Sequence, residues 1–343
     1  MILLAACQSP PVQPPNVPPS RVTEESTEEN GMEPVFDYEL PPPEAGLPVS
    51  PYREVWAYLI DGQESTLKAN FPITDIGYFS SDVDSYGKLV DIPDVKKISS
   101  FPGRKHLVVK SDGRALTHFV LKQGSPERQT LIRDLLEASR PYDGLQIDFE
   151  YVPPRDGDAF LSFLMELRAG LGGKVFSVAL PARTRTLQND VYDYIKIKPI
   201  VDRILVMAYD EHWSTSAPGP IASMAWCRNV ARYSLEVIGP EKLVMGLPFY
   251  GRTWGDINPN RAFFHEGIER IHREQGSPEI RRQEGIPTFK YETPLSVTVY
   301  YEDNYSLSAR LDMYQKMGTR AVGFWRLGME SPGFWPLIRL ERP

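Results

Sequence analysis

Two carboxylates and an amide occupy alternate positions near the middle of the chain. The stretch Asp143–Glu150 reads DGLQIDFE, so Gln146, Asp148 and Glu150 alternate with apolar residues. In a β-strand the three polar side chains share one face and the apolar ones share the other. Ionisable groups on a strand with an apolar back face are costly to bury. The pattern therefore predicts a cleft for proton transfer or polar-ligand binding, and the alternative is an exposed edge strand.

Short apolar runs that could form a scaffold for this strand recur after Tyr52. The eight runs are residues 54–60, 76–80, 106–110, 144–150, 175–180, 204–209, 243–249 and 321–325. Helix-like segments lie between them, and this alternation favours parallel βα units. We predict a (β/α)8 TIM barrel, with an open doubly wound sheet as the alternative. A glycine-rich phosphate-binding motif does not follow the first run, which argues against a nucleotide site.

The interval between the last two runs is too long for one crossover. About seventy residues separate Tyr250 from Ala321, more than an ordinary connection needs. Residues 288–291 and 297–301 alternate like short strands. We therefore predict a small α+β insertion at about residues 252–320, on the side of the barrel where active sites form.

Composition narrows the class of partner. The 343 residues carry a formal net charge of −7 without a Lys/Arg cluster, which argues against a nucleic-acid partner. A neutral or polar substrate fits this charge better. The histidines show no metal-ligand spacing, so we expect no metal and no other cofactor.

The first residues resemble a lipoprotein processing site. Leu4-Ala5-Ala6-Cys7 is similar to the lipobox at which bacterial lipoproteins are cleaved and acylated on cysteine. The preceding residues are too few for a complete signal peptide. We interpret residues 1–7 as a remnant of such a signal, with Cys7 as the lipidation site, and the alternative is a coincidental match. The interpretation implies a membrane-anchored lipoprotein of the bacterial cell envelope, facing the periplasm or the exterior.

Residues 8–51 combine many prolines with a run of glutamates. Such a segment cannot bury enough apolar surface to offset the entropy lost on ordering. We predict a disordered linker over 8–51 and a folded catalytic region over 52–343.

Four motifs together resemble a known family. Residues 143–150 resemble D-G-x-D-x-D-x-E, residues 207–210 resemble M-x-Y-D, residues 247–252 resemble L-P-F-Y-G-R, and Trp325 ends the last apolar run. In this order and spacing they resemble glycoside hydrolase family 18, the chitinase-like hydrolases. The family's S-x-G-G motif is absent, and residues 110–113 (KSDG) stand in its place.

Within that family the chain is more similar to bacterial spore-cortex and cell-wall lytic members than to secreted chitinases. Those members often carry an amide where Gln146 stands, and they resemble this chain over residues 301–303 and 323–328. The resemblance implies hydrolysis of β-1,4 bonds in a polysaccharide containing N-acetylglucosamine, with peptidoglycan as the expected substrate. The alternatives are a chitin or chitooligosaccharide hydrolase and a glycan-binding protein without turnover.

The resemblance also implies a retaining mechanism in which the substrate's own 2-acetamido group attacks the anomeric carbon. Glu150 would protonate the glycosidic oxygen and later activate water. Asp148 would share a proton with Glu150 and then stabilise the positively charged intermediate. Tyr209 would bind the acetamido carbonyl.

Further contacts to the sugar are implied by the same resemblance. The implied substrate-binding residues are Asp210, Trp325, Gln146, Met207, Tyr250, Arg252 and Tyr58. The alternative for Trp325 is core filling at the end of the barrel, and for Tyr250 it is packing at the end of its strand. For Tyr209 and Asp210 the alternative is a buried hydrogen-bonded pair. Trp213 and Trp254 are further candidates for sugar platforms, and Asp143 is expected to anchor its strand.

Gln146 stands where an aspartate is usual in the family. Its amide can donate a hydrogen bond to Asp148 and so favour the ionised form of that carboxyl. We therefore expect a more acidic pH optimum in this chain than in a Gln146→Asp variant.

Overall fold

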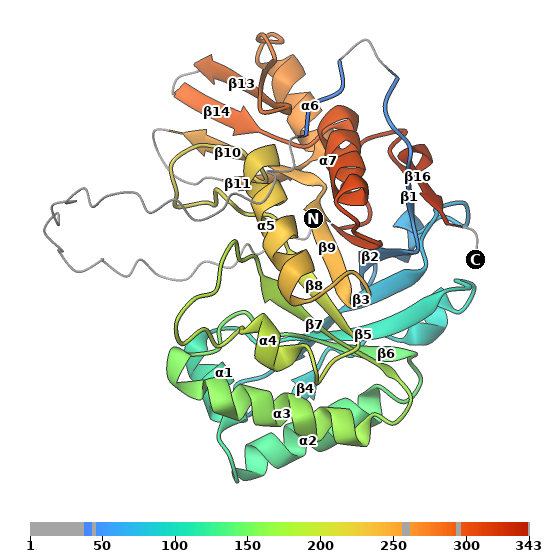
Figure 1. Cartoon of the computed structure of the whole chain (residues 1–343), viewed down its shortest axis with the longest axis vertical. Helices are drawn as coiled ribbons and strands as arrows, with labels where there is room; N and C mark the ends of the chain where they lie inside the picture. The colour runs from blue at the N-terminus through green and yellow to red at the C-terminus, as the bar shows by residue number, and fades with distance from the viewer. Residues whose placement is uncertain (1–37, 43–45, 256–260, 293–295, 342–343) are drawn as a thin grey trace, which may run out of the picture. The chain divides into compact units, whose positions relative to one another are not determined.

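Eight parallel strands close into a barrel in the computed structural model of the chain (Figure 1). The barrel strands are β2 (Glu54–Ile60), β3 (Asp75–Val83), β5 (Arg104–Lys110), β6 (Gly144–Asp148), β7 (Val175–Pro181), β8 (Arg203–Met207), β9 (Leu243–Pro248) and β15 (Ala321–Trp325). Strand β15 pairs with both β9 and β2, and β2 also pairs with β3. Because this pairing returns to its starting point, the sheet is closed and the predicted (β/α)8 barrel is confirmed.

The structure describes residues 38–42, 46–255, 261–292 and 296–341. Its α-helices are α1 (Arg114–Leu121), α2 (Pro126–Ala138), α3 (Gly157–Gly170), α4 (Tyr194–Ile197), α5 (Met224–Val237), α6 (His265–Glu274) and α7 (Asn304–Lys316). The other strands are β1 (Ser50–Tyr52), β4 (Leu89–Val90), β10 (Tyr250–Gly255), β11 (Arg261–Phe264), β12 (Arg281–Gln283), β13 (Ile286–Glu292), β14 (Ser296–Tyr300) and β16 (Ile338–Leu340). Single turns of 3₁₀ helix lie at Glu64–Thr66, Val95–Ile98, Pro154–Asp156 and Trp335–Leu337.

Alternation along the barrel strands separates two cores. Leu145 and Ile147 of β6 belong to the large cluster of buried apolar side chains that includes Phe163 of α3. A second cluster, built from residues such as Tyr58 and Leu205, comes from alternate positions of the strands and fills the barrel. The period of two in the β6 sequence thus places its apolar face under the helices and its polar face inside the barrel.

Charged side chains occupy the end of the barrel where the strands begin. Arg203 binds Glu54 through two nitrogens, at 2.5 and 2.9 Å. Arg104 binds Asp75 in the same manner at 2.6 and 2.9 Å, and His106 Nε2 lies 2.7 Å from the same carboxylate. Burial alone would raise the pKa of Glu54, but the hydrogen bond and charge of Arg203, helped by Arg104, outweigh it and lower the pKa to about 2.

The predicted α+β insertion is present between β9 and β15. Strands β10 to β14 form a separate antiparallel sheet, and α6 packs beside it (Figure 1). This unit has a small core of its own, with Ile268, Phe289, Val299 and Tyr301 buried together. The predicted limit at residue 320 was too late, because α7 contacts β1 and α5 and so serves as a helix of the barrel.

The predicted linker also ends earlier than expected. Residues 38–42 and 46–51 fall within its expected range, yet the structure describes them in contact with the folded region. The Tyr38 hydroxyl donates to Asp312 on α7 at 2.9 Å, and β1 pairs in parallel with β16. Apolar and aromatic residues near the end of the proline-rich segment give it enough surface to pack, which the average composition concealed. Residues 1–37, and Cys7 with them, lie outside the described residues.

Candidate active site

The predicted carboxylates lie at the end of the barrel where the strands finish. Asp148 is the last residue of β6, and Glu150 follows it in a turn. Asp148 is 6% exposed, and its Oδ1 atom has no hydrogen-bond partner among the described residues. Glu150 reaches solvent. One acid is therefore enclosed and the other is accessible, although they are two residues apart.

Burial and charge raise the pKa of both acids. Desolvation is the main cause of the high pKa of Asp148, and the charge of Glu150 raises it further. The pKa of Glu150 is raised by desolvation from the protein around its carboxyl and then by the charges of Asp210 and Asp112. The Lys110 ammonium opposes both shifts. Carboxyls held in this way keep a proton at a higher pH than ordinary ones, as an acid catalyst requires.

Gln146 lies inside the barrel below Asp148 and is fully buried. Its Oε1 atom accepts a short hydrogen bond from the Tyr58 hydroxyl, and its Nε2 atom donates to Ser177 at 3.1 Å. The expected hydrogen bond from Gln146 to Asp148 is absent among the described residues, where the amide nitrogen binds Ser177 and Asp148 Oδ1 has no partner. Gln146 and Tyr58 support the site from beneath.

Asp210 is held by two residues of β10. Its Oδ1 atom accepts from the Tyr250 hydroxyl at 2.6 Å and from Arg252 Nη2 at 2.9 Å. Asp210 has φ of +58°, a left-handed conformation that its short polar side chain tolerates better than most residues. Tyr250 and Arg252 were expected to contact sugar hydroxyls, and the structure places both against this carboxylate. They fix the charge that faces Glu150.

Aromatic side chains form an aromatic floor at the same end of the barrel. The Trp325 ring lies 5.3 Å from that of Tyr58 and 5.2 Å from that of Phe79, measured between centroids. Trp325 and Met207 are partly exposed and pack on the cluster that fills the barrel. Tyr209, also partly exposed, meets Tyr250 edge-on at 6.4 Å. A flat ring open on one face can pack against the axial C–H groups of a sugar.

Lys110 is the residue of this site that sequence reasoning missed. It ends β5 and is the Cα partner of Asp148 across the sheet. Its ammonium donates to Asp82 at 2.5 Å and makes a shorter contact to Asp112. Lys110 stands where the family's strand-three motif is absent, so no role was transferred to it. Its place at the carboxyl end of a predicted barrel strand was the available signal.

Three other predicted residues have clear positions. Trp213 is 51% exposed, and its indole nitrogen donates to Thr215 at 2.8 Å. Trp254 is buried and donates to the carbonyl of Trp213 at 3.2 Å, so it supports the exposed ring. Asp143 accepts a hydrogen bond from the amide of Lys105 at 2.8 Å. The expectation that Asp143 anchors its strand is confirmed.

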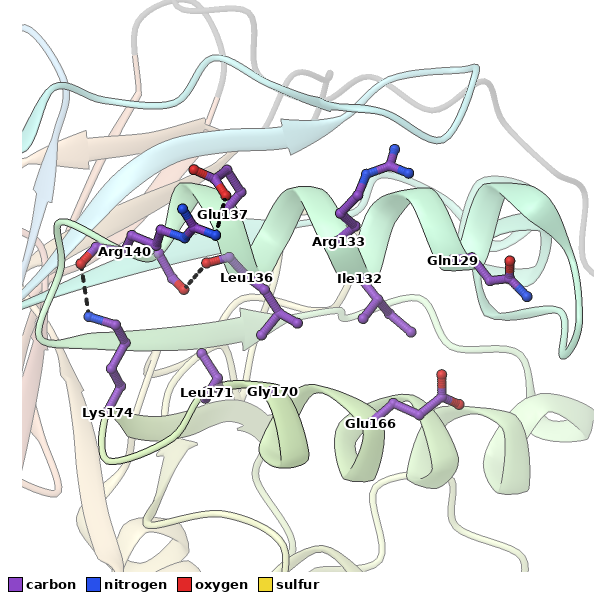
Figure 2. Close-up of a pocket in the computed structure, with 11 residues that line it drawn as sticks. Gln129, Ile132, Arg133, Leu136, Glu137, Arg140, Glu166, Gly170, Leu171 and Lys174 are labelled. Carbon is purple, nitrogen blue, oxygen red and sulfur yellow. Dashed lines mark hydrogen bonds and ion pairs between the residues drawn. The ribbon is translucent and has the colours of Figure 1, made fainter.

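A pocket of about 530 Å³ lies elsewhere, between α2 and α3 on the outside of the barrel (Figure 2). Gly170 lets the two helices approach, since a Cβ atom there would lie 2.4 Å from Leu136. The predicted site residues do not line this pocket. In the described part of the chain, no cluster of three or more His, Cys, Asp or Glu side chains could hold a metal ion. The helices of that part include none long and apolar enough to cross a membrane.

Comparison with known proteins gives the family. The profile named Glycosyl hydrolases family 18 matches residues 79–330, which is more than half of the chain. The Bacillus subtilis protein YdhD, named as a sporulation-specific glycosylase, is 31% identical over 227 residues, covering 62% of this chain and 53% of YdhD. The cortical fragment-lytic enzyme of Bacillus subtilis is 24% identical over 288 residues, covering 77% of this chain and 67% of that enzyme. The chain thus spans about half the length of YdhD.

Solved structures share the fold. The spore cortex-lytic enzyme SleL of Bacillus cereus superimposes with a TM-score of 0.76 at 23% identity, covering 85% of this chain and 76% of SleL. A chitinase from Chromobacterium violaceum gives a TM-score of 0.74 at 21% identity, covering 83% of this chain and 97% of the chitinase. These likenesses concern the fold alone, whereas the profile match spans the site carboxylates Asp148, Glu150 and Asp210. The chain belongs to glycosyl hydrolase family 18.

Proposed function

We propose that this chain is a retaining glycoside hydrolase that cleaves β-1,4 bonds following N-acetylglucosamine, with peptidoglycan as its substrate. The observation that supports this most strongly is the pair formed by Asp148 and Glu150. One carboxyl is enclosed and lacks a partner at Oδ1, the other is accessible, and both have a raised pKa.

In the first step, the carbonyl oxygen of the substrate's acetamido group attacks the anomeric carbon. The bond from that carbon to the glycosidic oxygen breaks, and Glu150 gives its proton to the leaving oxygen. The pair shares one proton, and with that proton on Glu150 the Asp148 carboxylate is ionised. Asp148 then accepts the acetamido N–H, and its negative charge stabilises the oxazolinium ion. Burial makes this charge more effective, because little water screens it.

In the second step, the Glu150 carboxylate takes a proton from water, and the oxygen of that water attacks the anomeric carbon. The ring of the intermediate opens, the acetamido group is restored, and the configuration is retained. Tyr209 holds the acetamido carbonyl through its hydroxyl, and the Trp325 ring supports the sugar from below. Asp210, fixed by Tyr250 and Arg252, raises the pKa of Glu150 and so favours the protonated form that begins the reaction.

The choice of peptidoglycan is supported by the names of the relatives. YdhD is named for sporulation, and the other enzyme is named for cortical fragments. The aromatic floor fits N-acetylglucosamine in either a wall polymer or chitin. Experiment therefore has to distinguish peptidoglycan from chitin as the substrate.

We test this by incubating the full chain with purified peptidoglycan and, separately, with chitin oligomers. Mass spectrometry then identifies the new reducing ends. We expect N-acetylglucosamine reducing ends from peptidoglycan, loss of product with Glu150→Gln, and full activity with Glu137→Gln, which changes an exposed carboxyl on α2. Faster cleavage of chitin oligomers would replace peptidoglycan with chitin. Saturable binding that Glu150→Gln leaves unchanged, without product, would identify a glycan-binding protein.

We further propose that Cys7 carries a lipid anchor in the bacterial cell envelope. The support is the lipobox-like Leu4-Ala5-Ala6-Cys7 followed by a proline-rich segment. Metabolic labelling with a fatty-acid analogue should mark the wild-type protein and leave a Cys7→Ala variant unlabelled. Equal labelling of the two proteins would reject the anchor.

A further inference from the structure

The turn that carries Glu150 is bridged by the hydroxyl of Tyr192. This hydroxyl donates to the carbonyl of Phe149 at 2.7 Å and accepts from the amide of Val152 at 3.0 Å. The two backbone groups lie on either side of Glu150 in the sequence. One side-chain oxygen therefore joins both ends of the turn.

Strand pairing does not provide this support. The pairing of β5 with β6 ends at Lys110 and Asp148, so Glu150 lies beyond the last paired residue. Buried backbone groups beyond the end of the sheet still need hydrogen-bond partners, and leaving one unpaired costs about 1–3 kcal/mol. Phe149 and Val152 are both buried. The Tyr192 hydroxyl supplies the partner that the sheet no longer offers.

Tyr192 is itself held firmly between β7 and α4. Its amide donates to Asp190 at 3.1 Å, and Asp190 binds Arg183 through both carboxylate oxygens, at 2.6 and 3.0 Å. The Arg183 guanidinium lies 5.9 Å from the centre of the Tyr192 ring. The Phe160 ring makes a T-shaped contact with the Tyr192 ring, with centroids 6.1 Å apart. Tyr192 is 6% exposed. A hydroxyl fixed in this way can determine where the turn sits.

We propose that Tyr192 is a positioning residue, which holds the turn 149–152 so that the Glu150 carboxyl faces the scissile bond. The inference rests on the proposed role of Glu150 as the proton donor. Proton transfer requires heavy atoms within hydrogen-bond reach, and a displacement of about 1 Å can lower the rate on the order of 100-fold. A freer turn would also increase the hydration of the Glu150 carboxyl.

Tyr194 offers a matched control on the same segment. It is 2% exposed, and its hydroxyl donates to the carbonyl of Pro181 at 2.6 Å. Tyr192→Phe and Tyr194→Phe therefore each remove one buried phenol hydroxyl bound to a backbone carbonyl. Only the first variant frees the turn around Glu150.

The kinetic test measures kcat, KM and the pH dependence of both variants. For Tyr192→Phe we expect kcat to fall about tenfold to 100-fold with KM within about twofold, because binding is kept and proton transfer is lost. The basic limb of the pH–rate profile should move to lower pH, because greater hydration of Glu150 lowers its pKa. Tyr194→Phe should leave kcat and the profile near those of the wild type. Equal effects of the two variants on all three measurements would overturn the inference.

Neither variant alters the charges around Glu150. These are Lys110 and Asp112 at the end of β5, Asp148 on β6 and Asp210 after β8. A shift of the pH profile in Tyr192→Phe alone therefore reports the position and hydration of Glu150.

A second measurement does not require turnover. NMR titration of the Glu150 carboxyl should show a pKa closer to its ordinary value in Tyr192→Phe and an unchanged pKa in Tyr194→Phe. If the wild type cleaves no glycan but the titrations differ, the proposed function fails and the positioning role stands. If the wild type cleaves glycan and the titrations agree, the positioning role fails.

Asp190→Asn loosens Tyr192 without removing its hydroxyl and should give a smaller effect in the same direction. This variant replaces Tyr192→Phe in both measurements if Tyr192→Phe does not fold.

Discussion

The two ends of the barrel surround their carboxylates in opposite ways. Where the strands begin, Glu54 and Asp75 bind Arg203 and Arg104 through paired hydrogen bonds. Where the strands finish, Asp148 is buried with an unpartnered oxygen. The lysine beside it, Lys110, is engaged by two other aspartates.

The carboxylates where the strands begin contribute to stability, and the acids where the strands finish are suited to proton transfer. The arginines hold the pKa of Glu54 low and join the strands, whereas burial and nearby negative charge raise the pKa of Asp148 and Glu150, as proton transfer requires. The same division between the two faces is general among barrel enzymes of this type. Changes at the two ends should therefore affect different measurements.

Glu150→Gln should have the largest effect, because it removes the proton donor and keeps the shape. We expect kcat to fall by about 10²- to 10⁴-fold. Thermal unfolding should show that the melting temperature does not fall, since a carboxyl with a raised pKa is replaced by a neutral group. Activity within about tenfold of the wild type would contradict the role given to Glu150.

Glu54→Gln should act at the other end, on stability. Because the folded-state pKa of about 2 lies below the unfolded value near 4.3, ionised Glu54 stabilises the fold above the unfolded value. This contribution, roughly 3 kcal/mol, is lost as the pH falls through about 2. Urea unfolding at several pH values should show the variant less stable than the wild type at neutral pH and equal to it near pH 2. The kcat of the folded variant should remain unchanged, and a difference in stability that is the same at every pH would count against the pairing.

Lys110→Met should sharpen the contrast by removing the cation nearest to Asp148. The pKa values of Asp148 and Glu150 should rise further, because the charge that opposes their shifts is gone. The basic limb of the pH–rate profile should move to higher pH. Lys110→Arg keeps the charge and should leave the limb near its wild-type position. A limb that moves equally in both variants would show that Lys110 acts through packing.

Gln146→Asp should give the smallest effect in the same direction. A second carboxyl below Asp148 adds negative charge and raises the pKa of the pair, so the wild type should have the more acidic pH optimum. The reason differs from the sequence-based one, since Gln146 donates to Ser177. Ser177→Ala controls for the loss of that hydrogen bond. Identical pH–rate profiles of wild type and Gln146→Asp would refute the prediction.

Local periodicity was sufficient to predict much of the fold. The alternation in residues 144–148 predicted which side chains face into the barrel, and the long interval after Tyr250 predicted the insertion. The linker boundary was less accurate, because composition was averaged over a segment whose last residues pack on α7 and β16. The average composition of residues 8–51 conceals the few apolar residues at its end that pack against the folded region.

Partners distant in sequence were beyond prediction. Tyr250 lies 40 residues from the aspartate it binds, and Tyr192 lies 43 residues from the carbonyl of Phe149. The family resemblance implied sugar contacts for Tyr250 and Arg252, yet both side chains bind a carboxylate of the protein, that of Asp210. Which donor meets which acceptor depends on how the barrel brings strand ends together.

The sequence by itself determined that Gln146, Asp148 and Glu150 share a strand face and that eight such strands recur, because side-chain alternation is a local property of the backbone. Only the tertiary structure decided which carboxylates are paired with arginines and which are not. Closure of the barrel brings arginines to Glu54 and Asp75 at one end and leaves Asp148 without such a partner at the other. The protonation of an acid depends on the burial and charge around it, and both arise only when distant strands meet.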